Sequence, residues 1–427
     1  MVVKINPSAI SGTIQAPASK SSMQRACAAA LLYKGETVIR NPGNSKDDLA
    51  ALDIIQKLGA TIIPKQDELL IQGNALQKGE IDFSGTINCG ESGLSVRMFT
   101  SIAAISSREI IITGNGSLLQ RPVKFFDEIF PALKISIQST GGLLPLKIKG
   151  PLIPVDITID GSLSSQFLTG LLFAYAHTCT SPVTITVNDL KSKPYIDLTL
   201  QVMKHFGWNI ENKNYHEFVF QPAGNTTKEK VIVYNVEGDW SNAAFLFVAG
   251  AIGGEVKVKG LDLNSSQGDK AILKVLEMAG SKMEIDEKEI TVANNRLQPF
   301  EFDATDCPDL FPPLVALAAY CKGITKIKGV GRLTHKESNR AVTLQNEFGK
   351  MGVTISWKDD VMFIEGGGVI KGTMVHSNND HRIAMACAIA ALQANGPVEI
   401  QDAEAIEKSY PDFYKHLTLL QQRPQKT

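Results

Sequence analysis

A stretch of small, apolar residues followed by a short alternating strand recurs along the chain. The copies read QRACAAALLYKGETVIRN, VRMFTSIAAISSREIIITG, SQFLTGLLFAYAHTCTSPVTITVN, AAFLFVAGAIGGEVKVKG, FPPLVALAAYCKGITKIKG and HRIAMACAIAALQANGPVEIQD. The turn between helix and strand falls at residues 35, 107, 181, 254, 323 and 396, so successive gaps are 72, 74, 73, 69 and 73 residues. Six copies at so even a period predict an internally repeated fold, and the small apolar residues predict a buried helix in each copy.

The remainder of each copy also follows one pattern. A strand precedes each small-residue helix, and an amphipathic helix that stops near Gly leads into a further strand, as in DDLAALDIIQKLGATIIP and AVTLQNEFGKMGVTIS. Each copy is therefore predicted to be one α+β layer. The last copy stops at YPDFYKHLTLL, before its closing strand. We expect the opening strand, between Val3 and Ile14, to supply it and so to bring the two termini together.

Three copies in each half predict two similar domains in an α/β protein built of α+β repeats. The first domain is expected over residues 20–238, and the second over residues 1–19 and 239–427. The chain would then cross between domains twice, at PASK and EGDW. Two short crossings favour a hinge, with the active site in the cleft between the domains.

Composition narrows the class of protein. A formal net charge of -1 argues against nucleic acid or an anionic membrane as partner. No apolar run approaches the ~20 residues of a membrane span, and MVVKINPSAI lacks the apolar core of a signal peptide. The six cysteines show no paired spacing, so we expect reduced thiols and a cytoplasmic protein.

Polar clusters open the small-residue helices. They are Ser19-Lys20-Ser21 with Arg25, Glu91-Ser92-Gly93 with Arg97, Ser164-Ser165-Gln166, Asp239 with Ser241-Asn242, Asp309, and Asp380-His381-Arg382. The loops after the second strands carry Gln120-Arg121, Ser192-Lys193-Pro194-Tyr195, Gln267-Gly268-Asp269, Lys336-Glu337-Ser338-Asn339-Arg340 and Lys408-Ser409. Helix N-termini favour anions. Cations such as Lys20 and Arg382 oppose the helix dipole there, so local stability does not account for them. A small ligand with several negative charges would account for these cations.

Other residues at these positions have a structural interpretation. Asp239, Ser241 and Asn242 are expected to cap a helix, and Asp269 and the pair Asp47-Asp48 to be loop or cap residues. The seven histidines lack metal-ligand spacing, and no dinucleotide glycine pattern follows a strand, so neither metal nor cofactor is expected. Acid–base chemistry remains, and its candidate proton carriers are Asp309, Glu337, His381 and Lys20.

At these residues the chain resembles the 5-enolpyruvylshikimate-3-phosphate synthase family. The matching pieces run in order over almost the whole chain: Ser19-Lys20-Ser21 with Arg25, Gly93 with Arg97, Arg121-Pro122, Ser164-Ser165-Gln166, Ser192-Lys193-Pro194-Tyr195-Ile196-Asp197, Asp309, Lys336-Glu337 with Arg340, Asp380-His381-Arg382, and Lys408. The resemblance implies an inside-out α/β barrel of two domains with three repeats each. It also implies a monomeric enzyme of chorismate biosynthesis, which transfers the enolpyruvyl group of phosphoenolpyruvate to the 5-hydroxyl of shikimate 3-phosphate and releases phosphate.

The resemblance assigns roles to these residues. Those implied for shikimate 3-phosphate are Lys20, Ser21, Arg25, Ser164, Ser165, Gln166, Ser192, Tyr195, Asp309 and Lys336. Those implied for phosphoenolpyruvate are Lys20, Gly93, Arg121, Gln166, Arg340, His381, Arg382 and Lys408. Asp309 would accept the hydroxyl proton, and Glu337 or Lys20 would protonate the methylene carbon.

Residues 91–94 are among the positions that depart from the family pattern. The family generally has Asn-Ala-Gly-Thr where this chain has Glu91-Ser92-Gly93-Leu94. A carboxylate facing that of phosphoenolpyruvate would repel it. We therefore expect Glu91 either to turn outward to a helix N-terminus or to pair with Lys20 or Arg121, and the role of Leu94 stays open.

Two alternatives remain. A UDP-N-acetylglucosamine enolpyruvyltransferase shares the implied fold and chemistry, but that family usually has a reactive Cys in the loop that here reads TGNGSLLQRP. A non-catalytic phosphometabolite-binding protein is the second alternative. Asp309 and Glu337 argue against it, because a binder of anions does not need them.

Overall fold

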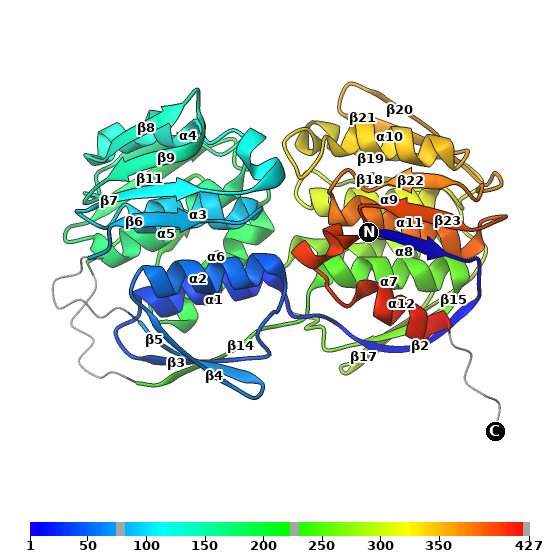
Figure 1. Ribbon diagram of the computed structural model, residues 1–427, viewed down its shortest axis with the longest axis horizontal. Helices are drawn as coiled ribbons and strands as arrows, with labels where there is room; N and C mark the ends of the chain where they lie inside the picture. The colour runs from blue at the N-terminus through cyan, green and yellow to red at the C-terminus, as the bar shows by residue number, and fades with distance from the viewer. Residues whose placement is uncertain (74–81, 223–229, 422–427) are drawn as a thin grey trace. The chain divides into compact units, whose positions relative to one another are not determined.

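The computed structural model describes residues 1–73, 82–222 and 230–421 (Figure 1). The chain forms two compact units. Unit 1 comprises Met1–Pro17 and Glu237–Thr427, and unit 2 comprises Ala18–Val236. The chain therefore passes from one unit to the other twice, between residues 17 and 18 and between residues 236 and 237.

Unit 2 contains three mixed sheets in its described residues, with strand orders β14-β3-β5-β4, β6-β7-β9-β8 and β10-β11-β13-β12. The strands are β3 (Glu36–Arg40), β4 (Thr61–Lys65), β5 (Glu68–Gln72), β6 (Gly85–Asn88), β7 (Glu109–Thr113), β8 (Ser136–Thr140), β9 (Leu143–Lys149), β10 (Ile157–Asp160), β11 (Val183–Asn188), β12 (Glu211–Lys213), β13 (Glu217–Phe220) and β14 (Ile232–Asn235). The helices are α1 (Lys20–Leu32), α2 (Lys46–Lys57), α3 (Gly93–Ala103), α4 (Phe125–Ile129), α5 (Ser165–Thr178) and α6 (Lys193–His205), with 3-10 turns η1 (Gly116–Gln120) and η2 (Phe130–Leu133).

Helices α1, α3 and α5 form the centre of unit 2 and contact one another. All of α3 and nearly all of α1 and α5 are buried, as the small-residue pattern predicts. Gly170 permits close approach of α5 to α3, because a Cβ there would lie 2.6 Å from the carbonyl oxygen of Met98. The helices are inside and the sheets lie around them.

Unit 1 has the same construction. Its sheets run β16-β17-β15-β2, β18-β19-β21-β20 and β1-β23-β22. The strands are β1 (Val2–Ile5), β2 (Ile10–Gln15), β15 (Gly254–Lys259), β16 (Lys282–Ile285), β17 (Glu289–Ala293), β18 (Glu301–Asp303), β19 (Gly323–Lys328), β20 (Thr354–Lys358), β21 (Val361–Gly366), β22 (Met374–His376) and β23 (Val398–Gln401). The helices are α7 (Trp240–Gly253), α8 (Ile272–Met278), α9 (Phe311–Ala318), α10 (Arg340–Lys350), α11 (His381–Ala390) and α12 (Phe413–Gln421), with 3-10 turns η3 (Gly268–Ala271), η4 (Pro308–Leu310), η5 (Val330–Leu333), η6 (Ala391–Gln393) and η7 (Ala403–Lys408).

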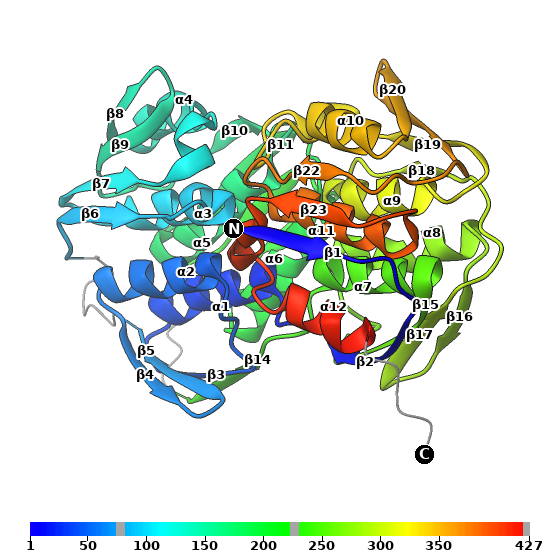
Figure 2. The ribbon, with the colours of Figure 1, turned by 45° about the vertical axis from the view of Figure 1, so that its right-hand side comes forward.

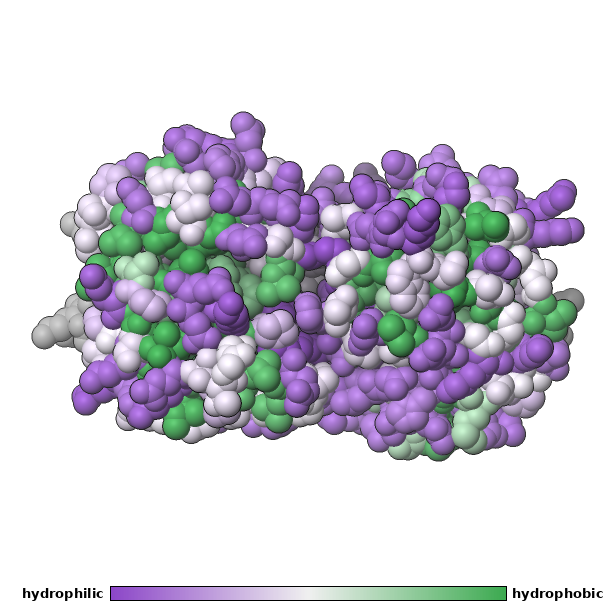
Figure 3. Space-filling view, turned by 90° about the horizontal axis from the view of Figure 1, so that it is seen from above, coloured by the Kyte–Doolittle hydropathy of each residue, from purple (hydrophilic) through white to green (hydrophobic). Residues whose placement is uncertain are grey.

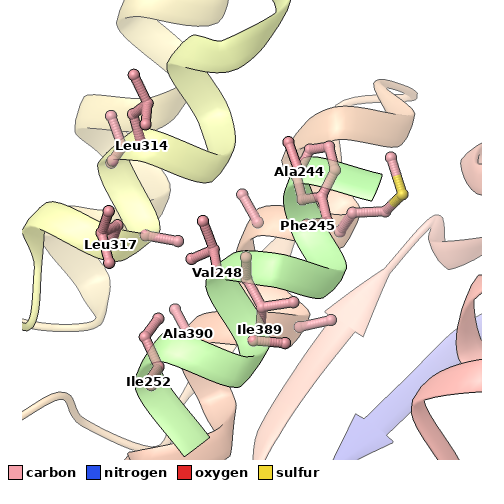
Figure 4. Packing of buried hydrophobic residues seen from close by; sticks show 14 of the residues in the cluster. Ala244, Phe245, Val248, Ile252, Leu314, Leu317, Ile389 and Ala390 are labelled. Carbon is pink, nitrogen blue, oxygen red and sulfur yellow. The ribbon is translucent and has the colours of Figure 1, made fainter. Parts of the chain in front are cut away.

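Helices α7, α9 and α11 make the core of unit 1. All fourteen residues of α7 are buried, so this helix has no solvent-exposed side. Figure 4 shows Val248 of α7 between Leu317 of α9 and Ile389 of α11. This packing fixes where the three helices begin, and the polar clusters predicted from the sequence stand at those beginnings.

Each sheet repeats one arrangement. A parallel strand lies on one side of a central strand, and an antiparallel strand lies on the other, as for β6 and β9 beside β7. Two repeats exchange their parallel strand. Strand β2 precedes α1 in sequence but pairs with β15 of unit 1, whereas β14 precedes α7 but pairs with β3 of unit 2.

The opening strand behaves differently from the prediction over part of its length. Only β1 completes the sheet of the last repeat, by antiparallel pairing with β23 (Figure 2). Strand β2 belongs to another sheet, so the expectation of one strand from Val3 to Ile14 is wrong. Pro7 separates the two strands, and proline has no N–H for a sheet ladder. The two ends of the described chain do meet, because Gln421 Nε2 donates to Ser8 Oγ at 2.9 Å.

The surface is mixed in character. On the face drawn in Figure 3, hydrophilic and hydrophobic residues are intermingled. Among the described residues, no helix has both the length and the apolar character needed to cross a membrane.

Candidate functional site

In unit 2, the first site residues lie at the start of α1. Ser19 caps this helix, since its Oγ accepts from the N–H of Ser22 at 3.3 Å. Lys20 follows and donates from Nζ to Asp47 Oδ2 at 2.8 Å. Asp47 is in the first turn of α2, where Ser45 and Asp48 form a capping box. The expectation that Asp48 caps a helix is confirmed, and Asp47 holds a site lysine.

Arg25 is one turn further along α1 and is 1% exposed. It donates from Nε to Thr199 Oγ1 at 2.9 Å, and from its terminal nitrogens to the carbonyl oxygens of Ser21 and Tyr195. No carboxylate pairs with it in the described part of the chain. Burial lowers the pKa of Arg25 to about 10. A buried cation whose contacts are all neutral is suited to an anionic ligand.

Gly93, the first residue of α3, lies beside arginine and amide groups. A Cβ at this position would be 2.9 Å from Arg121 Nη1 and 3.3 Å from Arg97 Nη1. Arg97 also donates from Nη1 to Gln166 Oε1 at 2.9 Å. A side chain at this position would therefore crowd the two guanidinium groups, which lie beside the N-terminus of α3.

Glu91 has turned toward another part of unit 2. Its Oε2 accepts from the backbone N–H of Ser117 at 3.2 Å and from the Ser117 hydroxyl at 3.4 Å. Ser117 is in the first turn of η1. These contacts match the expectation that Glu91 turns outward to a helix N-terminus, although the helix is η1 and not α3.

The serines and the tyrosine expected to bind substrate stand at the starts of α5 and α6. Ser164 caps α5 by accepting from the N–H of Gln166, and Ser165 is buried. Ser192 precedes α6 with a left-handed backbone, φ 55°. The carbonyl oxygen and ring of Tyr195 both lie near Arg25. Helices α1 and α6 thus bring these groups together within unit 2.

In unit 1, Asp309 occupies η4, immediately before α9. Its Oδ1 accepts from Arg340 Nη1 at 2.8 Å and from Lys336 Nζ at 3.2 Å. Its Oδ2 accepts from Arg382 Nη2 at 3.1 Å. Burial acts to raise the pKa of Asp309, but these three cations outweigh it and hold that pKa well below its usual value.

Arg340 is the most enclosed cation of this cluster, at 1% exposed. Besides Asp309 it donates from Nε to Asp380 Oδ2 at 2.8 Å and from Nη2 to Glu337 Oε2 at 2.5 Å. Burial acts against its charge, but the carboxylates of Asp380, Glu337 and Asp309 raise the pKa of Arg340 above its ordinary value.

Arg382 is the second residue of α11, and Asp380 caps that helix. It donates from Nη2 to Ser241 Oγ at 2.9 Å, and Ser241 in turn donates to Asp239. Its Nε and Nη1 are buried and have no hydrogen-bond partner in the described residues. Unsatisfied donors on a buried guanidinium are costly, and an anion at this position would satisfy them.

Lys408 and His381 complete the unit 1 cluster. Lys408, at the end of η7, donates from Nζ to the carbonyl oxygen of Asn379 at 2.5 Å. Asn379 has a left-handed backbone just before α11. His381 is 1% exposed, and its Nδ1 lies 3.9 Å from Asp380. Within residues 1–73, 82–222 and 230–421, no group of His, Cys, Asp and Glu side chains could hold a metal ion.

Several residues of these clusters were given no functional role from the sequence. Asp380 holds Arg340, Ser241 contacts Arg382, and Asp47 holds Lys20. All three stand in the first turn or at the cap of a helix, so capping chemistry explains their type. Their second role, contact with a cation of the candidate site, is visible only in the structure.

Known proteins resemble the chain over nearly its whole length. A family model described as EPSP synthase (3-phosphoshikimate 1-carboxyvinyltransferase) matches residues 5–417. The 3-phosphoshikimate 1-carboxyvinyltransferase of Clostridium perfringens is 38% identical over 415 residues, covering 97% of this chain and 96% of the relative. That of Clostridium acetobutylicum is 39% identical over 422 residues, covering 98% and 97%.

A solved structure supports the fold. EPSP synthase from Acinetobacter baumannii superposes with a TM-score of 0.80 over 98% of both chains, at 24% identity. The predicted inside-out α/β fold is thereby confirmed. The full-length relatives confirm the predicted carboxyvinyltransferase activity, so the binding-protein and UDP-N-acetylglucosamine alternatives are set aside. The chain belongs to the EPSP synthase (3-phosphoshikimate 1-carboxyvinyltransferase) family.

Proposed function

We propose that the enzyme carries out this transfer with the clusters described above, acting on one pair of substrates. Phosphoenolpyruvate adds to the 5-hydroxyl of shikimate 3-phosphate, and phosphate leaves from the tetrahedral intermediate. The observation that carries the proposal is Asp309, a carboxylate kept ionised among three cations that suit phosphate and carboxylate groups.

Shikimate 3-phosphate is assigned mainly to unit 2. Arg25 meets its carboxylate, since this buried guanidinium has only neutral contacts in the described chain. Its phosphate meets the N-terminal end of α5 at Ser164 and Ser165, with Lys336 from unit 1. The remaining proposed contacts are Lys20, Ser21, Gln166, Ser192 and Tyr195.

Phosphoenolpyruvate is assigned to Arg121, which lies beside the start of α3, and to the arginines at the starts of α10 and α11. Arg121 lies against Gly93, where no side chain intervenes. Arg382 offers its two unsatisfied donors, and Arg340 offers a planar fork once an anion competes with its carboxylate partners. The remaining proposed contacts are Lys20, Gln166, His381 and Lys408.

The proton transfers fall to Asp309, Glu337 and Lys20. Asp309 accepts the proton of the 5-hydroxyl, and Glu337 or Lys20 protonates the methylene carbon. The cations that hold the pKa of Asp309 low are the same ones assigned to substrate anions. As those anions take up the positive charge, the Asp309 carboxylate is less neutralised and becomes a stronger base. Binding and base strength are thereby coupled.

The reaction belongs to chorismate and aromatic amino-acid biosynthesis. We further propose that the enzyme works as a monomer in the cytoplasm. The six cysteines are all unpaired and buried, which suits a reducing compartment. The residues assigned to the substrates all come from one chain.

The assignment of the two substrates is tested by two arginine variants. Arg25→Ala should raise the Michaelis constant for shikimate 3-phosphate, and Arg382→Ala that for phosphoenolpyruvate, each by about tenfold to hundredfold, as expected for a charged hydrogen bond. Exposed arginines Arg40 in unit 2 and Arg296 in unit 1 provide matched controls. A change confined to the other substrate in either variant would refute the assignment.

A further inference from the structure

A chain of contacts links Glu91 to Arg121 through Ser117. Arg121 is 4% exposed and donates from Nη2 to Ser117 Oγ at 3.1 Å. The same hydroxyl donates to Glu91 Oε2. A serine hydroxyl can accept one hydrogen bond while it donates another, so the three side chains form one directed series.

The backbone fits the Glu91 carboxylate closely. The N–H of Ser117 donates to Glu91 Oε2, and a Cβ added at Gly116 would lie 2.4 Å from that oxygen. Gly116 also has φ +52°, a conformation that favours glycine. Glu91 and η1 are therefore held together by both hydrogen bonding and shape, and η1 leads directly into Arg121.

Electrostatics alone does not account for a glutamate here. A carboxylate close to a substrate anion would repel that anion and weaken its binding. Contact with the N–H of Ser117 draws the negative charge to the start of η1, where it is favourable. Glu91 thus has Ser117 as a structural partner, and Ser117 in turn contacts Arg121, which is assigned to phosphoenolpyruvate.

We propose that Glu91 is a positioning residue that acts through Ser117 to hold Arg121 against Gly93 for the binding of phosphoenolpyruvate. The proposal rests on the proposed function, in which Arg121 contacts that substrate. It makes Glu91 a determinant of phosphoenolpyruvate affinity that does not touch the substrate. Gln at position 91 keeps an acceptor oxygen for both Ser117 donors but removes the negative charge. Ala removes both. Comparing the two variants therefore separates the effect of the hydrogen bonds from the effect of the charge.

The experiment measures steady-state constants for both substrates, together with melting temperature, in Glu91→Ala, Glu91→Gln, Ser117→Ala and the Glu91→Ala/Ser117→Ala double variant. Glu91→Ala and Ser117→Ala should each raise the Michaelis constant for phosphoenolpyruvate by about threefold to tenfold, as for one lost hydrogen bond. Glu91→Gln should stay within about twofold of the wild type. The double variant should be no worse than the more affected single variant, because the residues act in series. The constant for shikimate 3-phosphate should not move.

Two further variants separate the possible failures. Glu109→Ala removes an exposed glutamate of β7 and serves as the control. Arg121→Ala tests the underlying assignment: an unchanged constant for phosphoenolpyruvate there would overturn the role of Arg121 itself. If Arg121→Ala weakens binding while Glu91→Ala and Ser117→Ala leave it unchanged or improve it, the positioning role alone is overturned. Additive effects in the double variant would also overturn it.

Discussion

Asp309 has three cations within 3.2 Å, and these cations set its protonation state in the absence of substrate. Lys336, Arg340 and Arg382 keep the carboxylate ionised, so it is ready to accept a proton but holds one weakly. An amide at this position would keep the shape and lose the charge.

Asp309→Asn is therefore predicted to lower kcat by ~10²–10⁴, as for loss of a general base. The Michaelis constant for phosphoenolpyruvate should stay the same or fall, because the variant no longer neutralises Arg382 and Arg340. Steady-state kinetics with both substrates measure this, with Asp303→Asn, an exposed carboxylate paired with Lys328, as the control. Near-normal kcat in Asp309→Asn would rule out the assignment of the base.

At this scale, cations at helix starts could be recognised from sequence because they oppose the dipole that a cap should complement. Both Arg25 and Arg382 are buried. Arg25 has only neutral hydrogen-bond partners, and two nitrogens of Arg382 have no partner in the described residues. Asp47, Asp380 and Ser241 could not be recognised. Each is also an ordinary residue for the start of a helix, and its contact with a site cation depends on a second element far away in sequence.

Helix packing sets where the site residues stand, and glycine makes that packing possible. Gly170 brings α5 against the backbone of α3, whose first turn carries Gly93. Gly349, on the exposed side of α10, has no atom within 4 Å of the position a Cβ would take. The structure thus leaves no room for a Cβ at Gly170 and leaves free space for one at Gly349.

Gly170→Ala is predicted to destabilise the protein by about 1–3 kcal/mol, since a Cβ 2.6 Å from Met98 O must force the helices apart. Gly349→Ala should stabilise it by about 0.4–1 kcal/mol, through loss of unfolded-state freedom. Urea unfolding of the two variants beside the wild type measures both. The same sign in both variants would contradict the packing argument.

Asp48 gives unfolding a pH dependence. Burial raises the pKa of this capping carboxylate from 3.8 to about 6. Below pH 4 the group is protonated in both states. Between pH 4 and 6 the folded state favours the proton more, so its stabilising contribution is lost as pH rises through 6. The free energy of unfolding of wild type minus that of Asp48→Asn should fall over this window by up to about 3 kcal/mol. A difference that is constant with pH would contradict this account.

The elements themselves were predictable from periodicity, and the pairing of two strands was not. The six-fold repeat places each helix and its following strand correctly. Periodicity could not show that β2 and β14 exchange sheets, because each has the same local pattern as its counterparts. The exchange depends on the two points at which the chain passes from one unit to the other, which the local sequence pattern does not reveal.

At the scale of the whole molecule, the two units carry different parts of the proposed chemistry. Unit 2 contributes Lys20, Arg25 and the groups around Gly93, and unit 1 contributes the base, Asp309, with its cations. Neither set contains all the groups that the proposal assigns to the reaction. The enzyme is therefore expected to act only when both substrates are present, and phosphate release reports the complete reaction.

The most direct test is the release of inorganic phosphate from phosphoenolpyruvate by the full chain, with shikimate 3-phosphate, with UDP-N-acetylglucosamine, or with neither. The account predicts rapid release with shikimate 3-phosphate and none above background in the other two reactions. It also predicts that Asp309→Asn loses the release while still binding substrate. Release with UDP-N-acetylglucosamine in place of shikimate 3-phosphate, or no release with either, would contradict it.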